Sequence, residues 1–255
     1  ATEMTKRLFI LGASVLQLPA ILEAKKMGFE VGVADMNPEA VGVPYADVFF
    51  PVSTTDIDGI ISSVESFEAD GIMTLATDMP MRTIAQVCER FPWMVGIDYE
   101  TAIRCTDKFE MIKAFHAHNV PAPWYKIVNR EELNSLIPNS FSYPCISKPI
   151  DASGSRGVSY IESPKALISA VRYSLTQSRD GKAIIEEYLD GDEISIEAIA
   201  VKGETHIIAI TDKVVTGQPY FVEMGHSQPS KYSLTHRDEI CQIATEAIRA
   251  VGIVN

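Results

Sequence analysis

Short apolar runs alternate with helical apolar patterns through the first hundred residues of the chain. Runs such as 8–11 and 31–34 are too short for helices and are bounded by polar or glycine residues. Between them, apolar residues recur every three or four positions. This alternation is typical of a parallel sheet flanked by helices. Strands are therefore predicted over residues 8–11, 31–34, 47–51 and 71–75, and helices over 15–27, 56–68 and 79–91.

The pattern changes from α/β to α+β after residue 106. Two alternating segments flank Lys202-Gly203-Glu204, which predicts an antiparallel hairpin with glycine at its turn. Gly252 follows the last amphipathic stretch and is expected to end that helix, with residues 253–254 beginning another strand. Helices are predicted over 108–118, 130–136, 164–176 and 237–251, and strands over 124–128, 145–149, 159–162, 183–188, 194–201 and 205–211.

Composition narrows the classes of partner. A chain of 255 residues with 46% apolar residues can build one large core or two medium ones. Its formal charge of −12 argues against nucleic acid as a partner, because a phosphate backbone needs a concentrated basic surface. No apolar run reaches the length of a membrane span, and the N-terminus lacks the basic region followed by an apolar region that is typical of a leader. We therefore expect no membrane association and a cytoplasmic location, with the four separated cysteines as reduced thiols.

One lysine stands directly before a loop of small residues. Lys148 leaves an apolar strand, and the residues that follow it soon become rich in serine and glycine. A lysine supplies a point charge and exposed backbone N–H groups supply a nest of donors, so together they suit anionic oxygens such as phosphates. The alternative for the loop alone is an ordinary turn between strands. The donors would come from Ser153, Gly154, Ser155 and Gly157.

The first βαβ unit also permits a dinucleotide-binding interpretation. Gly12 lies in the first turn, and Asp35 ends the second strand, where a ribose hydroxyl is held in such domains. Only the first glycine of G-x-G-x-x-G is present, however, because Ser14 and Gln17 occupy the other two positions. A nicotinamide- or flavin-dependent oxidoreductase is therefore the weakest of our hypotheses.

The order of several charged elements resembles the ATP-grasp superfamily. Asp107-Lys108 opens a helix, Lys148 precedes the small-residue loop, and the run Ile184-Ile185-Glu186-Glu187-Tyr188-Leu189 is followed by Glu193. The region around Gly12-Ala13-Ser14 is similar to the pre-ATP-grasp domain of carbamoyl-phosphate synthetases, purine-pathway ligases and biotin carboxylases. The resemblance implies a Rossmann-like pre-ATP-grasp domain over 1–106 and an incomplete ATP-grasp domain over 107–255. The latter would divide into 107–183 and 184–255.

The resemblance implies an ATP site. Lys108 and Lys148 would neutralise phosphate oxygens from two sides beneath the loop that contains Ser153, Gly154, Ser155 and Gly157. Arg156 would reach the same phosphates. The hinge residues Glu186, Glu187, Tyr188 and Leu189 would meet the adenine, with one of the two glutamates facing away because neighbouring strand residues face opposite ways. Glu193 would accept hydrogen bonds from the ribose.

An acceptor side is expected further along the chain, over residues 211–213 and 220–230. His226 lies in the region where carbamoyl-phosphate synthetase has a histidine near the γ-phosphate, and it would stabilise a developing acyl phosphate. The alternative is a surface histidine in a loop. Family members bind magnesium through an acidic residue on a later strand and a Glu-x-Asn element, so we expect no metal ligands within this chain and Mg²⁺ ligands beyond Asn255.

The function expected is therefore that of an ATP-dependent carboxylate-amine ligase that acts through an acyl phosphate. The chain is expected to be part of a longer ligase, inactive alone, or to receive the missing strands from elsewhere. A nucleotide-binding module without catalysis, and an enzyme of carbamoyl-phosphate synthetase or phosphoribosylglycinamide synthetase type, stay open as alternatives. The partners would be ATP with a small carboxylate and an amine, whose identities the sequence leaves open, and a homodimer is one of the assemblies allowed.

Overall fold

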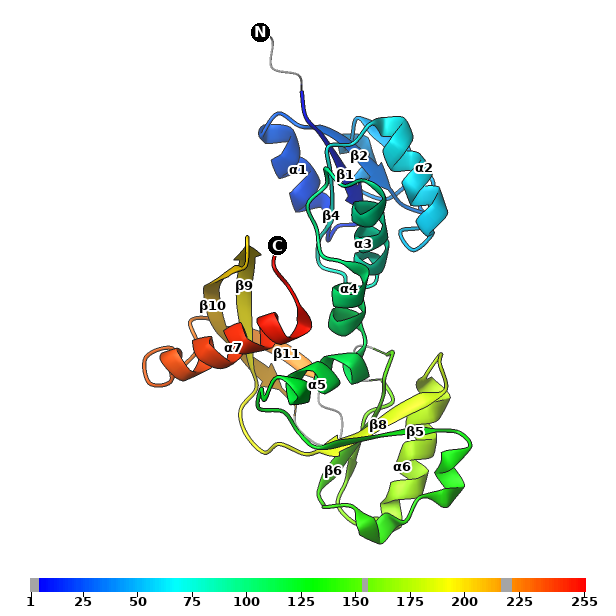
Figure 1. Cartoon of the computed structure of the whole chain (residues 1–255), viewed down its shortest axis with the longest axis vertical. Coiled ribbons are helices and arrows are strands. Elements are labelled where there is room, and N and C mark those ends of the chain that lie inside the picture. The colour runs from blue at the N-terminus through cyan, green and yellow to red at the C-terminus, as the bar shows by residue number, and fades with distance from the viewer. Residues whose placement is uncertain (1–4, 153–155, 217–221) are drawn as a thin grey trace. The chain divides into compact units, whose positions relative to one another are not determined.

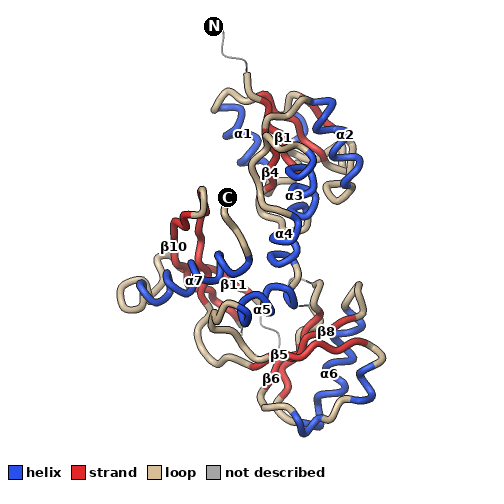
Figure 2. Tube along the Cα trace, viewed as in Figure 1, coloured by secondary structure: helices blue, strands red, loops and turns tan. Residues whose placement is uncertain are grey.

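The computed structural model describes residues 5–152, 156–216 and 222–255. It divides into two compact units, one that ends at Thr106 and one that runs from Asp107 to Val254 (Figure 1). Each unit has its own sheets and apolar core, and Figure 2 shows how strands and helices alternate in the first. No helix in the described ranges combines the length and apolar character needed to cross a membrane.

The first unit is built on a parallel sheet with the strand order β3-β2-β1-β4. Side chains of β1 alternate between two apolar layers: Phe9 and Leu11 pack with α2 and α3, whereas Ile10 packs with α1. Burial on both faces explains why these strands are continuously apolar. The elements are β1 (Arg7–Leu11), α1 (Leu18–Lys26), β2 (Glu30–Ala34), the 3₁₀ turn η1 (Val43–Tyr45), β3 (Val48–Phe50), α2 (Ile57–Phe67), β4 (Gly71–Thr74), α3 (Pro80–Arg90) and α4 (Tyr99–Thr106).

The second unit opens with a four-stranded antiparallel sheet in the order β5-β8-β6-β7. Helix α6 packs its apolar side on one face, and Ile112 of α5 meets Ile150 and Ile184 on the other. The sheet therefore has an α5 face and an α6 face. The elements are α5 (Lys108–Ala117), β5 (Tyr125–Asn129), η2 (Glu132–Ser135), η3 (Pro138–Ser140), β6 (Cys145–Pro149), β7 (Ser159–Ile161), α6 (Pro164–Gln177) and β8 (Lys182–Glu187).

A second antiparallel sheet follows, in the order β11-β10-β9. It consists of β9 (Ile194–Val201), β10 (Glu204–Val215) and β11 (Glu223–Ser227), and helix α7 (Arg237–Val251) lies against β10 and α5. Lys202 and Gly203 both have positive φ, as a tight hairpin turn requires. The predicted fold class, an α/β domain followed by an α+β region, is confirmed.

The structure corrects the predicted elements at four places. Residues 130–136 contain only the 3₁₀ turn η2, because the chain is extended at Leu136 and turns again at Pro138. Ile253 forms no strand: its N–H donates to the carbonyl of Ile248, which completes the cap of α7 at Gly252. Helix α4 and strand β11 were not predicted, and β11 carries no apolar alternation because nearly all of it is exposed.

Candidate functional site

Lys108 is fixed at the first turn of α5. Asp107 caps the helix, since its Oδ1 accepts hydrogen bonds from the N–H groups of Phe109 (2.9 Å) and Glu110 (3.0 Å). The Lys108 ammonium donates to the carbonyl of Ala152 at 2.6 Å. The cap and this contact hold the ammonium beside the entrance of the small-residue loop.

Lys148 and Glu186 form an ion pair between neighbouring strands on the α5 face. Lys148 of β6 lies opposite Ile184 and Glu186 of β8 lies opposite Ile146, so the two charged side chains are diagonal neighbours on one face. Their side chains are only 25% and 13% exposed. A carboxylate buried to this degree needs a cation beside it, and Lys148 supplies one.

The two lysines lie within electrostatic range of each other. Burial lowers the pKa of Lys108 below the ordinary lysine value, and the positive charge of Lys148 lowers it further. The carboxylates of Asp151, Asp107 and Glu186 act in the opposite direction without cancelling these effects. The α5 face thus holds a pair of ammonium groups that repel each other, an arrangement that a polyanion would relieve.

Asp151, which follows β6, is held in place by backbone hydrogen bonds. Asp151 accepts hydrogen bonds from the N–H groups of Arg179 (2.8 Å) and Asp180 (2.9 Å). Burial of Asp151 opposes its ionisation, but backbone donors outweigh this effect and lower its pKa. Its Oδ1 is buried without a hydrogen-bond partner among the residues described. Asp151, which the sequence reasoning missed, therefore anchors the start of the loop.

Gly157 ends the loop in a conformation that favours glycine. Its φ is +76°, and a Cβ there would lie 2.7 Å from Cγ of Pro149 and 2.8 Å from Cβ of Gln177. The buried hydroxyl of Ser174 donates to its carbonyl at 2.7 Å. Arg156 is exposed. The predicted donors Ser153, Gly154 and Ser155 lie outside the described residues.

The hinge residues, which run from the end of β8 to Leu189, point in different directions. Glu187 lies away from the lysines, where its carboxylate accepts from the N–H of Trp124 at 3.4 Å and its own N–H donates to the Trp124 carbonyl at 3.0 Å. The Tyr188 ring stands edge-on to Tyr160, with centroids 4.8 Å apart. Leu189 is 64% exposed and open to contact. Of the two adjacent glutamates, only Glu186 faces the lysine pair.

Glu193 belongs to a second charged cluster, centred on Lys213 of β10. The Lys213 ammonium lies 3.2 Å from Glu193 and 3.4 Å from Glu223, and His226 Nε2 lies 3.3 Å from the other Glu223 oxygen. Burial disfavours the charge of Lys213, but the two carboxylates outweigh it and raise its pKa. His226 is thus a strand residue, half exposed, instead of the loop residue considered from the sequence.

A network of short hydrogen bonds clasps the loop that carries Glu193. Asp192 accepts from Tyr232 Oη at 2.5 Å and from Lys231 Nζ at 2.6 Å. Asp212 in turn accepts from Ser230 Oγ at 2.6 Å and from the Lys231 N–H at 3.0 Å. We call these five residues the clasp. It ties the segment after β11 both to β10 and to the β8–β9 loop.

The sequence placed Lys213, Asp212 and Ser230 on the expected acceptor side but did not single out Asp192, Lys231 or Tyr232. Recognition of β11 as a strand would have shown that Lys213 and His226 are neighbours, because they lie directly opposite each other in the register. No comparable signal existed for the clasp, whose partners are separated along the chain and meet only in the folded sheet.

Asp35 has a structural task in the first unit. Its two oxygens accept the N–H groups of Ala13 and Asn37, each at 2.8 Å. Gln17, at a position where a dinucleotide fingerprint has glycine, is buried and donates to the carbonyl of Leu75 at 2.6 Å. These contacts close the first turn of the sheet instead of leaving it open for a pyrophosphate.

Metal ligands are not gathered at either charged cluster. Within the described residues, no three His, Cys, Asp or Glu side chains lie together in a way that could hold a metal ion. The two carboxylates nearest His226, those of Glu193 and Glu223, are both paired with Lys213.

Comparison with known proteins places these residues in a family context. The model of the ATP-grasp domain matches residues 105–255. The formate-dependent phosphoribosylglycinamide formyltransferase of Bordetella avium (strain 197N) is 28% identical over 268 residues, covering 97% of this chain and 64% of the relative. The chain thus spans less than two thirds of that relative's length.

Solved structures share the fold. The crystal structure of an L-amino acid ligase from Bacillus licheniformis matches with a TM-score of 0.82 at 23% identity, covering 100% of this chain and 62% of that one. A phosphoribosylglycinamide synthetase from Anaerococcus prevotii matches with a TM-score of 0.77 at 25% identity, covering 98% of this chain and 62% of that one.

Proposed function

This chain belongs to the ATP-grasp family, and we propose that it forms the ATP-binding part of an ATP-dependent carboxylate-amine ligase. The observation that carries the proposal is the pair of ammonium groups on the α5 face, Lys108 and Lys148, where burial and then the charge of Lys148 lower the pKa of Lys108. Such a pair attracts a polyphosphate, because each ammonium forms charge-assisted hydrogen bonds with phosphate oxygens.

The phosphates would lie against the lysines and under the loop that Asp151 and Gly157 anchor. Lys108 is held at the loop entrance by its contact with Ala152, so it can meet the phosphate oxygens without a large rearrangement. Lys148 would exchange part of its contact with Glu186 for phosphate. Donors from Ser153, Gly154, Ser155 and Gly157, and from Arg156, complete this proposed phosphate site.

The adenosine would extend from the lysine pair along the hinge at the end of β8. Glu186 lies on the lysine face and would accept from the adenine amino group, while main-chain groups of Glu187 and Tyr188 meet the same edge. The exposed side chain of Leu189 would contact the ring. Glu193, on the loop held by the clasp, would accept from the ribose hydroxyls.

The proposed reaction proceeds in two steps. A substrate carboxylate oxygen attacks the γ-phosphorus in line, and the bond between the γ-phosphorus and the oxygen that bridges it to the β-phosphate breaks. ADP leaves, and the substrate becomes an acyl phosphate. An amine then attacks the acyl carbonyl, phosphate leaves, and the new C–N bond remains after loss of a proton. The protein contributes positioning and neutralisation of charge.

His226 and Arg156 are the proposed catalytic side chains of the first step. His226 is half exposed and held beside Glu223, so a protonated imidazole there would stabilise the developing acyl phosphate. Magnesium would neutralise charge on the β- and γ-phosphates when bound. The small carboxylate and amine substrates, a homodimeric assembly and a cytoplasmic location are further parts of the proposal.

Calorimetric titration with a non-hydrolysable ATP analogue tests the nucleotide site. Lys148→Ala should weaken binding roughly tenfold or more, as expected for the loss of a charge-assisted contact of about 1.5 to 3 kcal/mol. Lys165→Ala is the matched control, because Lys165 is an exposed lysine on α6, the helix that covers the opposite face of the sheet. Equal affinities for all three proteins would remove Lys148 from the site.

Activity of the full-length protein separates the enzyme from a nucleotide-binding module without catalysis. The ligase predicts ADP and phosphate release that depends on both a carboxylate and an amine. Analogue binding without turnover in a screen of such substrates would favour the module. Release driven by bicarbonate or by a phosphoribosylamine would instead indicate chemistry of carbamoyl-phosphate synthetase or phosphoribosylglycinamide synthetase type.

A further inference from the structure

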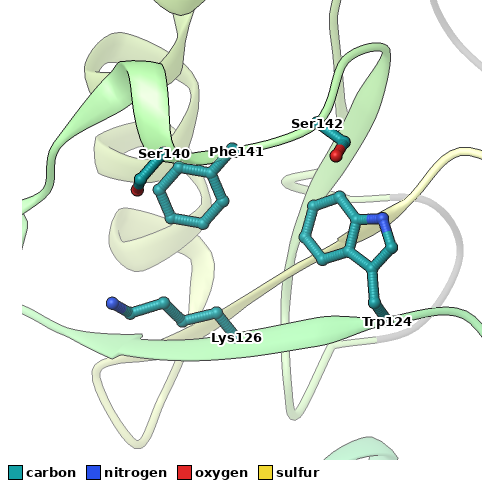
Figure 3. A pocket seen from close by; sticks show the side chains of 5 residues that line it. All are labelled: Trp124, Lys126, Ser140, Phe141 and Ser142. Atoms are coloured by element: carbon teal, nitrogen blue, oxygen red, sulfur yellow. The ribbon is translucent and has the colours of Figure 1, made fainter.

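A small cavity opens beside β5, away from the lysine pair. Its volume is about 310 Å³, and it is lined by Trp124, Lys126, Ser140, Phe141 and Ser142 (Figure 3). Lys126 lies opposite Ile185, whose side chain belongs to the core under α6, whereas the neighbouring Ile184 packs on the α5 face. The alternation of strand residues therefore puts this cavity on the opposite side of the sheet from Lys148.

Two aromatic rings form the walls of the cavity. The rings of Trp124 and Phe141 have centroids 6.3 Å apart and an interplanar angle of 41°, and both pack against the core beneath α6. The turn that presents Phe141 is fixed, since Tyr143 Oη donates to the carbonyl of Pro138 at 2.6 Å. The walls are therefore pre-organised and do not need a ligand to order them.

The polar groups of the cavity favour an anion. The Lys126 ammonium lies 5.8 Å from the centroid of the Phe141 ring, and among the described residues no carboxylate forms an ion pair with it. No acidic side chain lines the cavity. Ser140 adds no donor to the cavity, because its hydroxyl hydrogen is donated to the carbonyl of Ile137 at 2.8 Å, and the Ser142 hydroxyl lies beside Trp124 (Figure 3). The preference for an anion therefore comes from Lys126.

We propose that this cavity binds a small aromatic carboxylate, with its ring packed against the sides of Trp124 and Phe141 that line the cavity and its carboxylate beside Lys126. Aromatic rings pack favourably in tilted or edge-on contact with other rings, which selects a planar ligand over an aliphatic one. Lys126 forms no ion pair with the described residues, so its ammonium selects an acid over its amide. The site takes its ligand independently of the nucleotide, because the two lie on opposite faces of the sheet.

Tryptophan fluorescence can report this binding directly, because the chain contains only two tryptophans. The Trp93→Phe variant leaves Trp124 as the only tryptophan, which can be excited selectively over the tyrosines. Phenylacetate is the probe, phenylacetamide is its uncharged isostere, and cyclohexylacetate is its non-aromatic counterpart. Saturable quenching by phenylacetate is expected. The amide should bind about fivefold more weakly than phenylacetate, and the cyclohexyl acid at least about threefold more weakly.

Two variants place the ligand within the cavity. Lys126→Met should weaken phenylacetate about fivefold and leave phenylacetamide unchanged, whereas the matched exposed-lysine variant Lys165→Met should leave both unchanged. A saturating ATP analogue should not displace the probe. Absence of saturable quenching, equal affinity for acid and amide, or displacement by the nucleotide analogue would each overturn the proposal.

Discussion

Lys148 and Glu186 pair across two neighbouring strands on the face of the sheet that α5 covers, and Lys108 lies near enough for its pKa to respond to both. The pair does more than balance one buried carboxylate. The Glu186 carboxylate neutralises one of two adjacent ammonium groups when no phosphate is bound. Nucleotide phosphates would supply part of this negative charge, which links the stability of this region to ligand binding.

Glu186→Gln should destabilise the ligand-free protein. The substitution removes the counter-charge of Lys148 beside a second cation, and a loss of about 1–3 kcal/mol in the free energy of unfolding is expected. An ATP analogue should restore much of this stability, because its phosphates supply negative charge. Urea unfolding with and without the analogue measures both effects.

The control for this prediction is Glu162→Gln, an exposed glutamate on the same unit that should change stability little. The double variant Lys148→Met with Glu186→Gln should cost less than the sum of the single changes. Strict additivity would show that the ion pair contributes nothing to stability.

Nucleotide affinity should fall as the pH rises, and the fall should begin at a lower pH than the titration of an ordinary lysine would cause. Burial and Lys148 lower the pKa of Lys108 from 10.5, so its ammonium form is lost earlier in the folded protein than in the unfolded chain. Stability of the ligand-free protein therefore gains from this group as pH rises through that window, whereas phosphate binding weakens. Calorimetry in buffers of different ionisation enthalpy should detect proton uptake on binding, which Lys108→Arg should abolish.

Gly157→Ala should destabilise the protein more than the same change at Gly203. Both glycines have positive φ, 76° and 81°, so both variants carry a backbone penalty of about 1 kcal/mol. Only at Gly157 does the new Cβ meet the side chains of Pro149 and Gln177, whereas Gly203 has open space around it. Unfolding free energies that are equally reduced would contradict the close packing described.

The clasp should set how well the protein distinguishes ATP from 2′-deoxy-ATP. Tyr232→Phe removes one of the two side-chain donors to Asp192, which adjoins Glu193, the proposed ribose ligand. The preference for ATP should drop about threefold, as expected for a neutral hydrogen bond, while binding of pyrophosphate is unchanged. Equal weakening of ATP, 2′-deoxy-ATP and pyrophosphate would mean that Tyr232 supports the fold and not the ribose site.

The sequence allowed the lysine strand and its loop to be identified because local patterns determine them. Residues 145–149 are apolar apart from the serine and lysine that they contain, and the structure makes β6 over that range. Alternation also predicted that one of Glu186 and Glu187 faces away, but only the strand register shows that Glu186 faces Lys148. The proximity of Lys108 to Lys148 was expected from family resemblance alone.

Other parts of the site depend on contacts that no local pattern encodes. Strand β11 is exposed on nearly all of its residues, so it lacks the apolar alternation that marks a strand, and the pairing of Lys213 with this strand was not predicted. The clasp joins residues as far apart as Asp192 and Tyr232. Such pairs form only when two strands and a loop adopt their final register, which the sequence did not specify.

The most direct test of the central claim is a crystal structure of this protein with a non-hydrolysable ATP analogue. We predict phosphate oxygens within hydrogen-bond distance of both Lys108 Nζ and Lys148 Nζ, with the adenine against the hinge that ends at Leu189. An analogue bound elsewhere, or phosphates that contact neither lysine, would contradict the account.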